Sequence, residues 1–188
     1  MKKNESQDAL SLNNILDRLR QEYWKNLSER GTEEKQEGVE LLSFWLGDEN
    51  YGVDLSFSRH LLQMPRIVKL PRVPAHISGV FNLRGDIVAV LDLRVLFGMK
   101  ASALTDDSRL LVVESKGVSI ALLLDRIGDI IFAETKNLQK ITSEQISIPS
   151  QFLKGYFLPS REKEKILIYL DLEQLLASEK IVSGFKEG

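Results

Sequence analysis

The chain contains an internal repeat, and this repeat restricts its possible folds more than any other feature. The segment VPAHISGVFNLRGDIVAVLDLRVLFG, from Val73, can be aligned with IPSQFLKGYFLPSREKEKILIYLDLEQLLA, from Ile148. The matched positions are Pro74 with Pro149, Gly79 with Gly155, and Leu91-Asp92-Leu93 with Leu170-Asp171-Leu172. Each copy is predicted to form a proline-led turn, a hairpin and a short helix. The repeat therefore predicts two stacked β-modules, each an open barrel.

The repeated aspartates, Asp92 and Asp171, occupy equivalent positions in the two copies. Each directly follows an apolar strand and precedes a Leu-rich turn. Aspartate is a favoured residue immediately before a helix, because its carboxylate accepts a hydrogen bond from the first backbone N–H groups. We therefore expect both to cap helices rather than to act as catalytic acids.

Two further segments have the composition of β-hairpins. VELLSFWLGDENYGVDL is interrupted by Gly47-Asp48-Glu49-Asn50, and LLVVESKGVSIALLL is interrupted at Glu114 to Gly117. Both runs are rich in strand-forming residues, and both interruptions carry turn-forming residues. The chain after Gly38 is therefore predicted to be mainly β.

The residues before this β region have a different pattern. Leucine and tyrosine recur every three or four residues from Leu12 to Leu27, which gathers them on one side of a helix. Ser11 can cap the start of this helix, and GTEEKQEG from Gly31 is predicted as a charged linker. We expect two regions, 1–38 and 39–188. The helix can lie against the β region, bind a partner helix, or form part of a disordered tail.

The first copy of the repeat is joined by a tight turn, Asn82-Leu83-Arg84-Gly85. Gly85 can adopt the positive φ that such a turn needs, which holds Arg84 in one place. An arginine on a rigid turn can offer its planar fork to a carboxylate or a carbonyl with little loss of freedom. Arg84 is accordingly a candidate contact residue, or else the solvated tip of a hairpin.

Composition excludes several functions. The 25 Lys and Arg residues are balanced by 27 Asp and Glu, so no broad positive field attracts nucleic acid or an acidic membrane. The chain has no cysteine, and its two histidines, His60 and His76, lack the spacing of a helical metal pair. Scattered acids such as Glu114, Asp125 and Asp129 are expected to be solvated. We predict no enzyme activity, cofactor or metal.

A barrel that binds single-stranded nucleic acid is the other class considered, because such barrels use aromatic platforms in a basic groove. Only 7% of the residues are aromatic, and Phe44, Trp45 and Phe97 fall in patterns that predict core positions. We predict no nucleic-acid partner. The longest apolar run, Val118 to Leu124, is too short to span a bilayer, so no membrane insertion is expected either.

The segment ISGVFNLRGDIVAVLDLRVLFG resembles the signature of CheW-like chemotaxis coupling proteins. The resemblance extends, in the same order, to LLSFWLGDENYGVDL, to RLLVVESKGVSIALLLDRIGDII, and to FLKGYFL with ILIYLDLEQLL. It implies two small five-stranded SH3-like β-barrels that share a core, here with an extra N-terminal helix. It also implies a non-catalytic cytoplasmic adaptor, associated with membrane receptor arrays. The implied partners are the regulatory domain of a CheA-type histidine kinase and the cytoplasmic tip of methyl-accepting chemoreceptors.

The resemblance also implies a receptor-binding site. The Asn-Leu-Arg-Gly turn of the family corresponds to Asn82, Leu83, Arg84 and Gly85. After the YGVDL strand, family members usually carry a glutamate that can pair with the motif arginine, but this chain reads Ser58-Arg59-His60-Leu61. Arg59 and His60 are therefore included in the predicted site.

The replacement of the usual glutamate by His60 leaves two alternatives open. An imidazole cannot offset the charge of Arg84 as a carboxylate would, so either another acid does so or the arginine is less restrained. The replacement affects which receptor the protein would prefer. The alternative to a coupling protein of flagellar chemotaxis is therefore a CheW-like scaffold of a parallel pathway, such as surface motility, biofilm or development.

Overall fold

The structure is a computed structural model that describes residues 37–100, 103–141, 148–158 and 165–178, together with Gln21 and Ile181. The predicted N-terminal helix, apart from Gln21, and most of the charged linker lie outside these residues, as does the whole of 159–164 in the loop that joins the second hairpin. The division into regions 1–38 and 39–188 stays a prediction.

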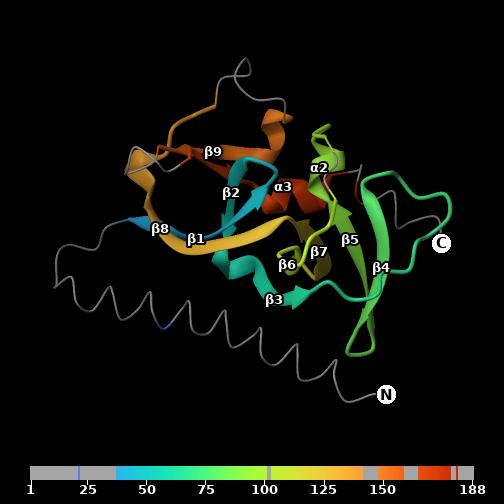
Figure 1. Cartoon of the computed structure of the whole chain (residues 1–188). Coiled ribbons are helices and arrows are strands. Elements are labelled where there is room, and N and C mark those ends of the chain that lie inside the picture. Colours follow the sequence, from blue (N-terminus) through green and yellow to red (C-terminus); the bar gives the residue numbers. More distant parts are fainter. Residues whose placement is uncertain are drawn as a thin grey trace.

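Ten strands form two five-stranded sheets that lie side by side (Figure 1). The first sheet has the order β8-β1-β2-β10-β9 and the second sheet the order β3-β6-β7-β5-β4. The first sheet consists of β8 (Arg126–Glu134), β1 (Gly38–Leu46), β2 (Glu49–Asp54), β10 (Leu167–Leu170) and β9 (Leu153–Phe157). The second consists of β3 (Ser58–Gln63), β6 (Arg109–Ser115), β7 (Val118–Leu124), β5 (Asp86–Asp92) and β4 (Ile77–Leu83).

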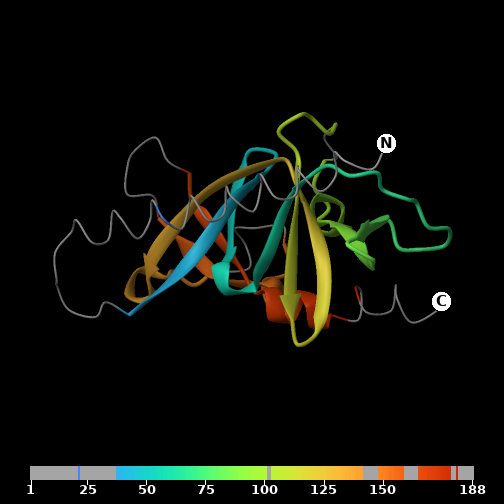
Figure 2. The ribbon, with the colours of Figure 1, turned by 90° about the horizontal axis from the view of Figure 1, so that it is seen from below.

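Five short helical elements connect or follow these strands. They are the 3₁₀ turns η1 (Leu55–Phe57), η2 (Thr135–Asn137) and η3 (Ser150–Phe152), and the helices α2 (Leu93–Leu96) and α3 (Leu172–Ala177). Helix α3 lies close to the β6–β7 hairpin, as the view from below shows (Figure 2). The predominance of strands confirms the expected mainly β class.

The two sheets repeat one topology, but each is assembled from segments distant in the sequence. Hairpin β1–β2 pairs with β10 in parallel, and hairpin β6–β7 pairs with β5 in parallel. The first hairpin of the chain is therefore completed by the last one and by β8, while the strands β3 to β7 build the second sheet. The repeat predicted the duplication correctly, but the two modules are interleaved rather than consecutive.

The aligned positions of the repeat make equivalent contacts in the two sheets. Val80 forms an isolated antiparallel bridge with Val68, and Tyr156 forms one with Gln139. The N–H of Asp92 donates to the carbonyl of His76, and the N–H of Asp171 donates to that of Phe152, both at 2.8 Å. Because each pair occupies matched positions, the alignment made from the sequence is confirmed at the level of individual hydrogen bonds.

Three clusters of buried side chains hold the sheets together. The largest draws on one face of both sheets, with residues such as Phe44 and Leu111, and is a shared core. The opposite face of the second sheet buries a smaller cluster around Val90, and that of the first sheet one around Leu41. No ladder joins the two edge strands of either sheet within the described ranges, so five-stranded sheets with a common core are confirmed, but closed barrels are not.

Burial on both faces explains why β6 reads as a continuous apolar run. Leu111 and Val113 contribute to the shared core, whereas Leu110 and Val112 point to the smaller cluster of the second sheet. A strand that is covered on both sides needs no polar face. Truncation of a side chain such as Leu111 to alanine is expected to cost about 2 to 5 kcal/mol.

Both repeated aspartates cap helices, as expected. The Asp92 carboxylate accepts from the N–H of Arg94, and the Asp171 carboxylate accepts from the N–H of Gln174. The prediction for Trp45 was wrong, since its side chain is only partly buried. It is covered instead by Arg126, whose guanidinium carbon lies 4.7 Å from the ring centroid.

Candidate functional site

The Asn-Leu-Arg-Gly motif forms the end of hairpin β4–β5. Leu83 pairs with Asp86, so the loop between them contains only Arg84 and Gly85, with φ values of 56° and 110°. The side-chain oxygen of Asn82 accepts from the N–H of Gly85 at 3.0 Å. Positive φ at both loop residues is the geometry of a tight type I′ hairpin turn, which fits the twist of the flanking strands.

Each residue of the turn has a separate role. Leu83 is half-buried and packs against the smaller cluster of the second sheet, which anchors the hairpin end. An added Cβ at Gly85 would meet no atom within 4 Å, so glycine is needed there only for its backbone conformation. Arg84 itself adopts a left-handed conformation, which is costly for a side chain of this size and was not expected from the sequence. The turn therefore displays Arg84 on a fixed backbone.

Arg84 is exposed, and no ion pair to it occurs among the residues that the structure describes. Asp86 follows it directly but makes no ion pair with it. Of the two alternatives left open by the sequence, the structure favours a less restrained arginine. Its five N–H donors can therefore be offered to an acceptor on another molecule.

Arg59 lies on β3, at the opposite edge of the second sheet from β4. Its Nε lies 3.3 Å from Glu114 Oε2 on β6, and its Nη1 donates to the carbonyl of Ser56 at 2.7 Å. Both charged side chains of this pair are more than 40% exposed, so the pair stabilises the fold only slightly. Glu114, which the sequence placed among solvated acids, thus neutralises part of the charge of Arg59.

His60 connects the two arginines electrostatically. Burial is the largest cause that lowers the pKa of His60 below its usual value of 6.5, and the charges of Arg84 and Arg59 lower it further. The imidazole is therefore neutral at pH 7. Because the charges of both arginines act on the imidazole, Arg84 in the β4–β5 turn lies near Arg59 and His60 of β3, although β3 and β4 are the two edge strands of the sheet.

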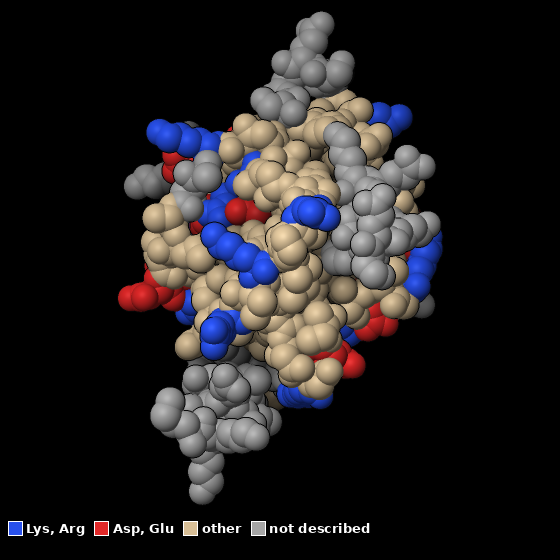
Figure 3. Space-filling model, turned by 90° about the vertical axis from the view of Figure 1, so that its right-hand side faces the viewer, with Lys and Arg blue, Asp and Glu red and all other residues tan. Residues whose placement is uncertain are grey.

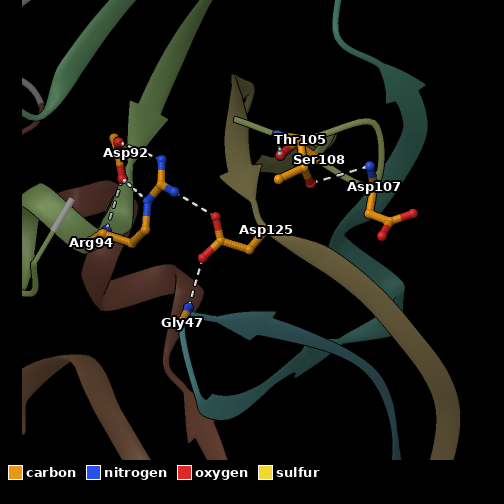
Figure 4. A network of polar contacts seen from close by, with 7 residues as sticks. All are labelled: Gly47, Asp92, Arg94, Thr105, Asp107, Ser108 and Asp125. Carbon is orange, nitrogen blue, oxygen red and sulfur yellow. Dashed lines mark hydrogen bonds and ion pairs between the residues drawn. The ribbon is translucent and has the colours of Figure 1, made fainter. Parts of the chain in front are cut away.

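A second polar network, which sequence analysis missed, is centred on Arg94 at the start of α2 (Figure 4). Its Nη2 lies 2.9 Å from Asp92 Oδ2, and its Nη1 lies 2.5 Å from Asp125 Oδ1. Asp125 Oδ2 in turn accepts from the N–H of Gly47 at 2.6 Å. The network thus ties the end of β5 to the turn between β1 and β2, which belongs to the other sheet.

Arg94 is almost fully buried, with a side-chain exposure of 3%. The hydrogen bond to Asp92 is the largest cause that raises its pKa above the usual value, and burial acts in the opposite direction. The residue is positioned to orient the two sheets rather than to contact a ligand. The only signal in the sequence was the repeat, where Asp92-Leu93-Arg94 aligns with Asp171-Leu172-Glu173 and the arginine has no counterpart.

The described residues offer neither a metal site nor a membrane-spanning helix. They gather no group of three or more His, Asp or Glu side chains that could hold a metal ion. They also include no helix that is long and apolar enough to cross a membrane.

Comparison with known proteins identifies a family and several relatives of this chain. The family model of the CheW-like domain matches residues 40–180. The chemotaxis protein CheW of Klebsiella aerogenes is 27% identical over 144 residues, which cover 77% of this chain and 85% of that protein. Protein PilI of Pseudomonas aeruginosa is 31% identical over 100 residues, which cover 52% of this chain and 56% of that protein.

The fold is similar to that of a solved structure. The crystal structure of the scaffolding protein TtCheW from Thermoanaerobacter tengcongensis superposes with a TM-score of 0.66 at 27% identity, and the match covers 76% of this chain and 95% of that one. The family match spans both sheets and the Asn82–Gly85 turn. The chain therefore belongs to the family of proteins with a CheW-like domain.

Proposed function

We propose that this protein is a non-catalytic adaptor that couples methyl-accepting chemoreceptors to a CheA-type histidine kinase. The observation that carries the proposal is the CheW-like domain, which occupies residues 40–180 and folds as two sheets of identical topology on one core. A rigid body built in this way can present two separate surfaces at a fixed distance from each other. One would bind the cytoplasmic tip of the receptor, and the other the regulatory domain of the kinase.

The receptor-binding surface is proposed to include Asn82, Leu83, Arg84 and Gly85, with Arg59 and His60 beside them. Support comes from the rigid turn, from the exposure of Arg84, and from the electrostatic proximity of the two arginines to His60. An arginine whose backbone is already fixed loses less conformational entropy when it binds a partner. A receptor tip with acceptors opposite Arg84 would complete its hydrogen bonds.

The alternative is a scaffold of a parallel pathway, such as surface motility, biofilm or development. Two observations support this alternative function. The chain is similar to protein PilI as well as to proteins named CheW, and it has His60 at the position where the resemblance implies a glutamate. Both candidates share the adaptor mechanism and differ in the receptor that is bound.

The proposal is tested by titrating the purified full-length chain with a receptor-tip hairpin and, separately, with the kinase regulatory domain, using calorimetry. We expect each partner to bind with saturable stoichiometry and no covalent change in either. Arg84→Glu should weaken receptor binding by about tenfold or more, because it reverses a charge at the contact, while kinase binding is unchanged. Lys140→Glu, at an exposed lysine outside the site, is the matched control. Retention of full receptor affinity by Arg84→Glu would remove Arg84 from the site.

A further inference from the structure

The chain carries a sharply localised positive charge. Between Leu55 and Gly85 the sequence contains no Asp or Glu, although the whole chain has 27 of them and a net charge of -2. The same interval contains five cations, Arg59, Arg66, Lys69, Arg72 and Arg84. Three of them lie on residues 64–73, which follow β3 and which we name the basic strap. The predicted receptor site accounts for the other two only.

The basic strap is held firmly against β4. Val68 exchanges two backbone hydrogen bonds with Val80, at 2.8 and 2.9 Å, and Ile67 packs against the smaller cluster of the second sheet. The contact is close, since a Cβ added at Gly79 would lie 2.3 Å from the carbonyl oxygen of Val68. The strap therefore extends the second sheet by a short antiparallel segment and does not behave as a loose loop.

The outer surface of the strap combines apolar and positive side chains. Val68 is 54% exposed and Leu70 is 38% exposed, and the exposed Arg66, Lys69 and Arg72 alternate with them along the strap. Across the described parts of the chain, none of these three cations forms an ion pair. A solvated surface gains nothing from exposed valine and leucine in this position, whereas a protein interface combines an apolar centre with a polar rim.

Backbone conformation fixes two cations of this surface. Arg72 follows Pro71 in the turn that ends the strap, and it adopts φ of 60°, at a turn position where glycine or asparagine is usual. Arg84, at the far end of β4, is left-handed as well. Lys116, in the β6–β7 turn, is left-handed too, so this conformation restricts the backbone of Arg72 and Arg84 without marking the strap by itself.

These cations form one band along β4. The antiparallel bridge between Val68 and Val80 means that the strap runs back along β4 from the end that carries Arg84 towards Arg72. Figure 3 shows the face in question, where Lys and Arg side chains stand among uncharged residues and most Asp and Glu side chains lie nearer the margin. The basic strap is therefore continuous with the proposed receptor site.

The chemistry of the band favours a protein partner with carboxylates. Nucleic acid would call for a wider positive field and aromatic platforms, but the exposed large side chains of the strap are aliphatic. A membrane surface is bound most often by an amphipathic helix with aromatic anchors, not by a short extended segment. In an extended segment alternate side chains project from the same side, which groups Arg66 with Val68 and Leu70.

We propose that the basic strap docks an acidic face of the receptor's helical hairpin, beside the contact made by Arg84. The inference rests on the proposed function, because it assigns a second contact to the same partner. Carboxylates of the hairpin pair with Arg66, Lys69 and Arg72. The exposed side chains of Val68 and Leu70 fill the apolar positions between them.

The test compares two full-length variants with the same change in charge. One carries Arg66→Gln, Lys69→Gln and Arg72→Gln, and the control carries Lys116→Gln, Lys136→Gln and Lys140→Gln at exposed lysines elsewhere. Binding to the purified receptor-tip hairpin and to the kinase regulatory domain is measured between low and high salt. The strap variant should bind the hairpin about five- to a hundredfold more weakly at low salt and with a smaller salt dependence. The control variant should stay within about twofold of the wild type.

Arg72→Gly separates binding from folding. It removes one cation but places glycine in the left-handed conformation, so the melting temperature should be equal to or higher than that of the wild type. Hairpin binding should nevertheless weaken. A loss of affinity in a variant that is at least as stable cannot be attributed to damage of the fold.

The remaining outcomes are distinct from one another. Wild-type affinity of the strap variant for the hairpin would overturn the strap assignment and leave the proposed function intact. A loss confined to the kinase domain, or to vesicles containing phosphatidylserine, would also overturn the receptor as occupant. If the wild-type chain bound neither protein, the proposed function itself would fail, and the strap assignment with it.

Discussion

Arg94 Nη1 donates to Asp125 Oδ1 at 2.5 Å. This contact connects the end of β5, in the second sheet, to the residue that joins β7 to β8 of the first sheet. Asp125 lies between β7 and β8, which belong to different sheets, and it also accepts from Gly47. The relative orientation of the sheets thus depends on one buried cation as well as on the shared apolar core. An adaptor that presents two surfaces needs this orientation to be fixed.

The first prediction concerns this network. Arg94→Met should lower the free energy of unfolding by about 3 to 5 kcal/mol, because it leaves the Asp92 carboxylate buried without its cation. Arg59→Met is the matched control, since its pair with Glu114 is exposed and should contribute less than about 1 kcal/mol. Urea denaturation measures both. Equal stability of Arg94→Met and Arg59→Met would mean that the network does not hold the sheets.

The second prediction concerns the titration of His60. The pKa of this histidine is lowered in the folded state, so the unfolded chain binds the proton more readily and stability rises with pH between the two pKa values. Acidification from pH 7.5 through the usual value of 6.5 should therefore destabilise the wild type more than His60→Gln. Unfolding curves at several pH values measure the difference, which should vanish above about pH 7.5.

Two arginine variants test the cause of this shift. Arg84→Gln should raise the pKa of His60 more than Arg59→Gln does, because Arg84 is the larger of the two charge effects. Neither should restore the usual value, since burial remains. NMR titration of the imidazole resonances reports the pKa directly. A His60 pKa that is insensitive to both substitutions would show that the three residues do not share a site.

The fourth prediction concerns the glycines. Gly85→Ala should cost about 1 to 2 kcal/mol, because the left-handed backbone is its only obstacle. Gly79→Ala and Gly155→Ala should each cost more, since an added Cβ would lie 2.3 Å from the carbonyl oxygen of Val68 and 2.4 Å from that of Gln139. Thermal unfolding of the three variants gives the order. A smaller cost at Gly79 and Gly155 than at Gly85 would contradict the close approach of the Val68 and Gln139 backbones to these two glycines.

Much of the fold could be predicted from the sequence because its signals are local. The repeat predicted a hairpin followed by a short helix in each copy, and the position after each apolar strand predicted the caps Asp92 and Asp171. The pairing of hairpin β1–β2 with β10 could not be predicted in this way. Strand period determines which residues face a core, but the choice of partner strand depends on packing between distant segments.

The site was predictable where backbone geometry depends on residue type. Gly85 signalled a positive φ, and the structure has it. The left-handed conformation of Arg84 was not predictable, since arginine rarely adopts it. The burial of Arg94 was not predictable either, because arginine is mostly exposed unless it is paired. Its partner Asp125 is 31 residues away in the sequence, so no local pattern indicated the pair.

The most direct test of the central claim is whether the chain bridges two proteins. A labelled receptor-tip hairpin, the kinase regulatory domain and this chain are mixed and separated by size-exclusion chromatography with light scattering. The account predicts that the hairpin and the kinase domain co-elute only when this chain is present, in a complex whose mass equals the sum of the three components. Mutually exclusive binding of the two partners would contradict it.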